Sequence, residues 1–143
     1  MTVRTFLDSN VLIYAHDIDA GAKHGVAARV VAELWQSGEG VISTQVLQEF
    51  YVNVTRKIPS PLPRVTARQV VRAYSVWQTE LVGPSEVLRA SELEEEHRLS
   101  FWDALIVATA LKGGAGRILT EDLSPGQSLS GLQIVNPFAA SRG

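Results

Sequence analysis

The chain has 143 residues, 45% of them hydrophobic and 20% charged, which predicts one globular domain over residues 1–143. Its net charge of −2 argues against a surface that is basic throughout, and the absence of cysteine excludes disulfides, thiolate metal sites and cysteine nucleophiles. The sequence has no apolar signal core and no apolar run long enough to span a bilayer. We therefore expect a soluble, cytoplasmic protein that does not contact a membrane.

The first half of the chain predicts two strands, each followed by helices. Short β-rich runs indicate the strands, whereas apolar residues three and four apart indicate the helices. The predicted elements are a strand over 3–7, a helix over 11–16, a helix over 24–36, a strand over 41–43 and a helix capped by Thr44.

The second half begins after three prolines that break the chain at 59–63. Its predicted elements are a helix over 66–78, a strand over 81–82, a helix from a Ser85 cap to about 99, a helix over 101–112 capped by Ser100, and strands over 117–120 and 132–135. The alternation of strands and helices predicts an α/β fold, with a mainly parallel central sheet of about five strands flanked by helices.

Four acidic residues are expected at one edge of this sheet. Asp8 and Asp122 each follow a predicted strand, and the carboxyl ends of parallel strands share an edge. Crossover helices begin at that same edge, which places Asp103, in the first turn of its helix, and Glu49, in the second turn of another, beside them. The sequence therefore predicts an acidic cluster.

Such a cluster is unstable without compensation, because two like charges about 4 Å apart repel by about 4 kcal/mol at an effective dielectric near 20. The carboxylates must take up protons or bind cations. Oxygen ligands without cysteine favour hard ions such as Mg²⁺ or Mn²⁺. These ions activate water and stabilise the leaving oxygen in phosphodiester cleavage.

Each acid also has a purely structural interpretation. Asp8 can cap the first helix, and Asp103 fits the third position of a capping box. Asp122 can be a turn residue, and Glu49 a solvated helix residue. Both interpretations are open for each acid alone, but all four acids fall on one predicted edge, which favours a common role.

Four sequence blocks resemble those of PIN-domain nucleases in order and spacing, and the resemblance covers nearly the whole chain. The blocks are FLDSNVLIY at 6–14, STQVLQEF at 43–50, LSFWDALIVA at 99–108 and LTEDL at 119–123. The segment IVNPF at 134–138 is similar to one branch of the family. In size, the chain is similar to VapC-type toxins of bacterial toxin–antitoxin pairs.

The resemblance implies a Mg²⁺- or Mn²⁺-dependent endoribonuclease that cleaves RNA, is usually a homodimer and is inhibited by a cognate antitoxin. By position, it implies that Asp8 and Asp103 are the principal metal ligands. Glu49 would complete the cluster or act through water, and Asp122 would be the fourth acid. Asn10 matches a frequent supporting polar residue.

A basic segment without Asp or Glu extends from residue 50 to 79. Arg64, Arg68 and Arg72 recur every four residues, so a helix that extends back to Arg64 carries them as one stripe. A basic stripe can follow an RNA backbone, and the competing interpretation is a solvated helix face. The tryptophans at 35, 77 and 102 are expected to pack in the core or an interface rather than to stack on bases.

The sequence also allows other assignments of the site and of the function. Glu121 lies beside Asp122 and can contribute in its place. The main rival function is a non-catalytic PIN-fold module that binds RNA or a protein, although such a module has no need for four clustered carboxylates. A metal-dependent phosphatase or DNase would share the same ion chemistry.

Overall fold

The computed structural model describes residues 3–139, within which six strands form one sheet in the order β3-β2-β1-β4-β6-β5. All neighbouring strands are parallel except β5 and β6, which are antiparallel. The strands are β1 (Thr5–Leu7), β2 (Gly40–Ser43), β3 (Gln78–Glu80), β4 (Arg117–Leu119), β5 (Ser128–Leu129) and β6 (Leu132–Val135). The predicted α/β fold is confirmed, and the sheet gains one strand because the two-residue β5 is too short to leave a sequence pattern.

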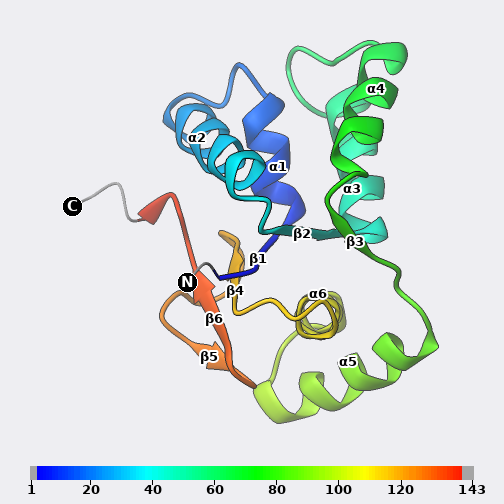
Figure 1. Ribbon diagram of the computed structural model, residues 1–143, viewed down its shortest axis with the longest axis vertical. Helices are drawn as coiled ribbons and strands as arrows, with labels where there is room; N and C mark the ends of the chain where they lie inside the picture. Colours follow the sequence, from blue (N-terminus) through cyan, green and yellow to red (C-terminus); the bar gives the residue numbers. More distant parts are fainter. Residues whose placement is uncertain (1–2, 140–143) are drawn as a thin grey trace.

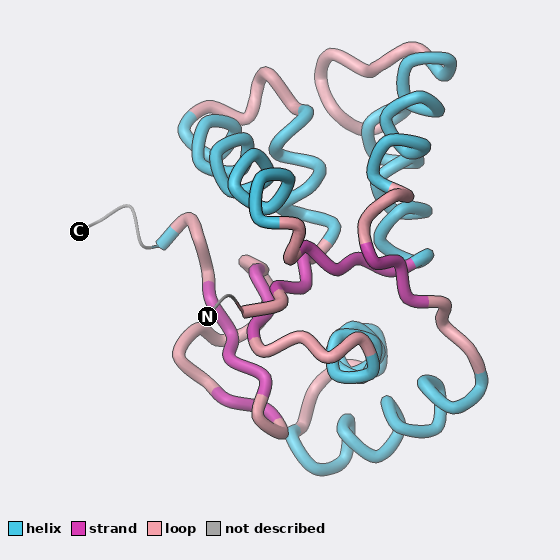
Figure 2. The backbone as a smooth tube through the Cα atoms, in the orientation of Figure 1, coloured by secondary structure: helices cyan, strands magenta, loops and turns pink. Residues whose placement is uncertain are grey.

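Helices cover both faces of the sheet (Figure 1). On one face lie α1 (Ser9–His16), α2 (Ala22–Ser37), α3 (Thr44–Arg56) and α4 (Arg64–Tyr74), and on the other lie α5 (Pro84–His97) and α6 (Phe101–Lys112). The chain adds β2 and β3 on one side of β1 and then returns to place β4 on the other. Right-handed crossovers that run in opposite directions along the sheet place their helices on opposite faces. Figure 2 shows the strands between these two layers of helices. None of the helices within residues 3–139 is long and apolar enough to cross a membrane.

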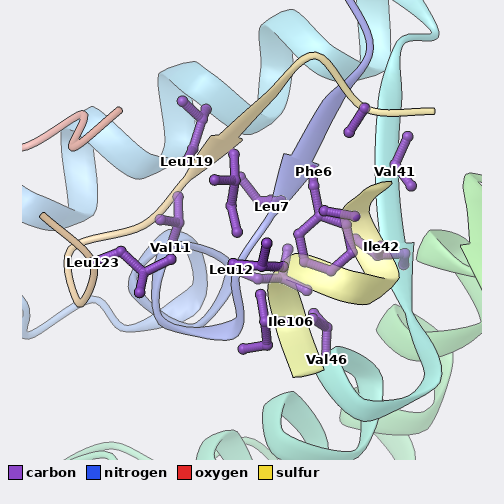
Figure 3. Close-up of a cluster of buried hydrophobic side chains, with 14 of the residues drawn as sticks. Phe6, Leu7, Val11, Leu12, Val41, Ile42, Val46, Ile106, Leu119 and Leu123 are labelled. Carbon is purple, nitrogen blue, oxygen red and sulfur yellow. The ribbon is translucent and has the colours of Figure 1, made fainter. Parts of the chain in front are cut away.

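The core lies around the central strands, where buried apolar side chains of the strands pack against those of the covering helices (Figure 3). Phe6 and Leu7 of β1 are fully buried, as expected for a parallel strand covered on both faces. Helix α6 is buried at every position from 104 to 110, because it packs between the sheet and α5. Each candidate acid lies one to three residues from a buried apolar side chain, which anchors the backbone there in the core. The pairs are Asp8 with Leu7, Glu49 with Val46, Asp103 with Ile106 and Asp122 with Leu123.

Two helices begin beside the predicted caps rather than at them. Ser43 caps α3, because its side chain accepts a hydrogen bond of 3.2 Å from the backbone N–H of Val46. Thr44, the predicted cap, is already the first helical residue. Gly83 rather than Ser85 is the residue before α5. The backbone N–H of Gly83 donates a hydrogen bond to the carboxylate of Glu86 in the first turn of that helix. Local hydrogen-bond geometry thus decides the boundary where several cap residues are adjacent.

The segment after α4 differs most from the prediction. Helix α4 begins at Arg64, two residues before the predicted start, and ends at Tyr74. Strand β3 occupies Gln78–Glu80 instead of 81–82, paired with β2 from Val41 opposite Gln78 to Ser43 opposite Glu80. These polar strand residues lack an apolar strand pattern, so tertiary pairing determines their conformation.

Candidate active site

The site lies at the carboxyl ends of β1 and β4, the two neighbouring strands between which the strand order reverses. Open α/β sheets place ligand sites at such a switch point. Asp8 follows β1 and Thr120 follows β4. The Thr120 hydroxyl donates a hydrogen bond of 2.7 Å to Asp8 Oδ2, and its oxygen accepts the backbone N–H of Asp122 at 3.1 Å. Buried Thr120 therefore fixes Asp8 directly and Asp122 through the backbone.

Asn10 in the first turn of α1 bridges the same two carboxylates. Its Nδ2 donates to Asp122 Oδ2 at 2.9 Å and lies 3.5 Å from Asp8 Oδ2. Because this nitrogen faces the carboxylates, Oδ1 points elsewhere, and within residues 3–139 this buried oxygen has no hydrogen-bond partner. A buried polar atom of this kind normally pairs with water or an ion. Asn10 thus supplies an unsatisfied oxygen beside two acids.

Glu49 joins the cluster through Ser9. The Ser9 hydroxyl donates to Glu49 Oε1 at 2.8 Å, and the Ser9 backbone N–H donates to Asp8 Oδ1 at 2.7 Å. This second hydrogen bond also makes Asp8 the N-cap of α1, so the structural interpretation of Asp8 holds together with its place in the cluster. Ser9 therefore connects the carboxylates of Asp8 and Glu49.

Asp103 lies in the first turn of α6, where its backbone N–H donates to the side chain of the cap residue Ser100 at 3.1 Å. Burial raises the pKa of the Asp103 carboxyl, the interaction with Ser100 lowers it, and the negative charge of Asp122 raises it again, with a net upward shift. Asp103, on a helix of the face opposite α1 and α3, is therefore near enough to Asp122 for that charge to raise its pKa. The four predicted acids converge on one edge.

Asp8 is the most deeply buried acid of the cluster, with 3% of its surface exposed. Burial raises the pKa of its carboxyl to about 6, despite the hydrogen bonds from Thr120 and Ser9, and the charges of Asp122 and Glu49 add to the rise. The site therefore disfavours the ionised form of the Asp8 carboxyl. A bound cation would relieve this excess of negative charge.

The donor set fits a hard divalent cation that keeps part of its water. Carboxylate oxygens are the ligands that Mg²⁺ takes, commonly one or two carboxylates together with several waters. In the described part of the chain, no three Asp, Glu or His side chains are placed so that they could hold a metal ion together. The carboxylates of Asp8, Glu49 and Asp122 are instead linked by hydrogen bonds through Ser9, Asn10 and Thr120.

Glu121 belongs to a different network from Asp122. Its carboxylate accepts hydrogen bonds from the Tyr14 hydroxyl at 2.6 Å and from Lys23 Nζ at 2.8 Å. Partial burial raises the pKa of Glu121, but Lys23 and Tyr14 outweigh it and lower the pKa below its usual value. Lys23 also lies 5.0 Å from the centre of the Tyr14 ring. Of the two neighbours, only Asp122 contacts Asn10 in the described structure.

The remaining candidates lie outside the cluster. Arg64, Arg68 and Arg72 are exposed on α4, opposite the buried side of that helix. Of the three tryptophans expected in the core or an interface, Trp77 is in the core, whereas Trp35 is 42% exposed and Trp102 65% exposed, so for these two packing in an interface stays a prediction. Trp102 is the most exposed of the three. The cause is its position on α6, because the buried run of that helix starts two residues later.

Sequence reasoning missed Ser9 and Thr120, the two hydroxyl residues that orient the acids. Both stand beside an acid within the quoted blocks, as Asp8-Ser9 and Thr120-Glu121-Asp122. That adjacency is the only signal in the sequence, and it does not reveal that Thr120 donates to Asp8, 112 positions away.

Comparisons with known proteins agree with this architecture. The PIN domain family profile matches residues 5–124. The structure is similar to Mycobacterium tuberculosis VapC20, described as a sarcin–ricin loop cleaving toxin, with TM-score 0.60, 25% identity, and coverage of 80% of this chain and 86% of that chain. A search of curated proteins found no match to this sequence.

Two complexes share the fold at lower identity. A toxin–antitoxin complex from Klebsiella pneumoniae matches with TM-score 0.68 and 22% identity, over 93% of this chain and 97% of that chain. DNA-bound VapBC from Salmonella typhimurium matches with TM-score 0.66 and 15% identity, over 95% and 99%. These complexes show the same fold, and the family match over residues 5–124 establishes that the chain belongs to the PIN domain family.

Proposed function

We propose that the chain is a metal-dependent endoribonuclease and the toxin of a type II toxin–antitoxin pair. The observation that carries the proposal is Asp8 at the strand switch point, where burial, together with the charges of Asp122 and Glu49, raises the pKa of its carboxyl. Four acids are costly to assemble unless a cation binds them. The similarity to a toxin that cleaves the sarcin–ricin loop supports RNA as the substrate.

In this proposal, Asp8 and Asp103 are the principal ligands of Mg²⁺ or Mn²⁺, Glu49 and Asp122 complete the acidic cluster, and Asn10 supports it. The bound ion supplies activation of water and stabilisation of the leaving oxygen. Thr120 holds the Asp8 carboxylate in one orientation, and Ser9 does the same for Glu49. These hydrogen bonds fix the ligand oxygens in advance, as supporting residues of metal sites do.

The partners follow from the same proposal. The similarity to toxin–antitoxin complexes supports a cognate antitoxin protein as the inhibitor. We also propose a homodimer, because the described residues leave large apolar side chains exposed, among them Leu81 at 67% and Leu88 at 70%. Such a toxin would act as a single-domain protein in the cytoplasm, where RNA is available.

The test uses chain expressed without any antitoxin, and three substrates: a labelled single-stranded RNA, the DNA of the same sequence, and p-nitrophenyl phosphate. We expect RNA cleavage in Mn²⁺ or Mg²⁺ and none in EDTA. Equal RNA cleavage in EDTA would contradict the metal's role. Cleavage of DNA alone, or of the small ester alone, would favour the DNase or phosphatase. RNA binding without cleavage in any metal would favour the non-catalytic module.

The basic stripe gives a separate prediction about RNA binding. Arg64, Arg68 and Arg72 are exposed, and the salt bridges found within residues 3–139 do not include them. Replacing all three by Gln is expected to leave the fold intact and to weaken RNA binding. The slope of log K against log salt should shrink by about 2, at roughly 0.7 per phosphate contact for a single strand.

Fluorescence anisotropy of labelled RNA over a salt series measures this slope. Arg89→Gln is the control, because Arg89 lies on α5, on the opposite face of the sheet from α4. An unchanged slope in the triple variant would assign the stripe to a solvated helix face.

A further inference from the structure

An exposed tryptophan stands beside the acidic cluster. Trp102 directly precedes Asp103 in the first turn of α6 and is 65% exposed. Its ring meets the adjacent Phe101 ring edge-on, with 5.3 Å between the ring centres. An indole ring is a large flat surface that gains free energy when it is covered, and its place directly before a candidate ligand makes it a candidate contact for the substrate.

Arg98 lies four residues before Trp102 in the sequence. Arg98 ends α5 in the left-handed backbone conformation, with φ 55°, and its side chain is exposed. The salt bridges recorded over 3–139 do not include Arg98. The connection 98–100 and the first turn of α6 therefore carry an exposed arginine and, four residues later, an exposed indole ring directly before Asp103.

Trp102 is separate from the other exposed apolar side chains of this face. Leu81 and Leu88 lie toward the opposite end of α6, because Lys112 in its last turn contacts the Leu81 carbonyl at 3.0 Å and the Glu86 carboxylate at 3.3 Å. Ten residues of helix separate Trp102 from Lys112, about 15 Å at 1.5 Å per residue. An exposed indole ring with an exposed arginine four residues before it suits a nucleic acid better than an extended apolar protein interface.

We propose that Trp102 stacks on an unpaired base of the RNA next to the phosphodiester bond at the acidic cluster, with Arg98 on a flanking phosphate. The inference rests on the proposed function and adds a substrate requirement. Aromatic rings bind single-stranded RNA by stacking on bases, whereas bases within a duplex have both faces covered by their neighbours. The preferred substrate is then an unpaired loop or single strand.

The test measures binding of a labelled RNA in Mn²⁺ to Asp8→Asn protein, a background chosen to keep the RNA intact. Adding Trp102→Leu is expected to weaken binding by roughly 5- to 150-fold, the range of one stacked base. Trp102→Phe keeps an aromatic ring and should retain most of the affinity. Ile18→Ala, at an apolar side chain that is 71% exposed in the turn between α1 and α2, is the matched control and should change nothing.

Three outcomes would overturn the inference: undiminished binding by Trp102→Leu, equal preference for the same sequence within a duplex, or a lower affinity that light scattering traces to a lost dimer. In the cleavage-competent protein we expect Trp102→Leu to raise KM more than it lowers kcat. If wild-type protein cuts RNA and Trp102→Leu has unchanged KM and affinity, the inference fails and the proposed function stands. If no metal supports cleavage but Trp102→Leu still weakens binding, the proposed function fails and the stacking role stands.

Discussion

Asp8→Asn and Asp103→Asn are each expected to reduce kcat for RNA cleavage by on the order of 10³-fold or more, while the protein stays folded. Both replacements keep the size of the side chain and remove one carboxylate from the proposed metal site. Asn at position 8 can still accept the Thr120 hydroxyl through its amide oxygen. The backbone N–H of residue 103 can still cap α6 with Ser100. The loss should therefore reflect chemistry rather than unfolding.

Single-turnover cleavage of one labelled RNA at saturating protein gives the rate, and circular dichroism checks the fold. Asp19→Asn is the matched control, because Asp19 is an exposed carboxylate that accepts a hydrogen bond from Ser60, outside the cluster. Full activity in both Asp8→Asn and Asp103→Asn would remove the acidic cluster from the mechanism.

Asp8→Asn is expected to be more stable than the wild type at neutral pH in EDTA. The pKa of Asp8 is about 6 in the folded protein against 3.8 ordinarily, so the folded state binds more protons between these values. Wild-type stability therefore falls as pH rises through this window, by about 3 kcal/mol from this one group. Asn removes that cost and forfeits one hydrogen bond of about 1 kcal/mol, which leaves a net gain of about 2 kcal/mol near pH 7.5.

Urea unfolding of both proteins in EDTA at pH 4 and pH 7.5 measures the effect. Near pH 4 Asp8 is mostly protonated in the folded wild type, so the advantage of the variant should largely vanish. Adding Mn²⁺ at pH 7.5 should stabilise the wild type more than the variant, since a ligand of the folded state stabilises it by mass action. A variant less stable than wild type at both pH values would show that burial of the ionised Asp8 carboxylate does not lower the free energy of unfolding.

The sequence predicted the part of the site that backbone topology controls. Asp8 and Asp122 follow parallel strands and Asp103 begins a crossover helix, so alternation of strands and helices was enough to bring them to one edge. The buried run of α6 was equally visible, because a helix covered on both sides is apolar all round.

The parts that depend on side-chain contacts were not predictable. Thr120 reads as an ordinary strand-end residue until its hydroxyl is found 2.7 Å from Asp8. The separate roles of Glu121 and Asp122 depend on which way adjacent side chains point, toward Tyr14 or toward Asn10. Polar β3 and the exposure of Trp102 follow from tertiary packing, which a single sequence pattern does not contain.

The most direct test of the central claim incubates total RNA with the wild type and with Asp8→Asn, in Mn²⁺, Mg²⁺ or EDTA, and maps new RNA ends by sequencing. We predict discrete cuts that need the metal and are absent with Asp8→Asn, at unpaired positions. Cuts of equal number in EDTA or with Asp8→Asn, or no cuts by folded, inhibitor-free wild type in either metal, would contradict a metal-dependent endoribonuclease.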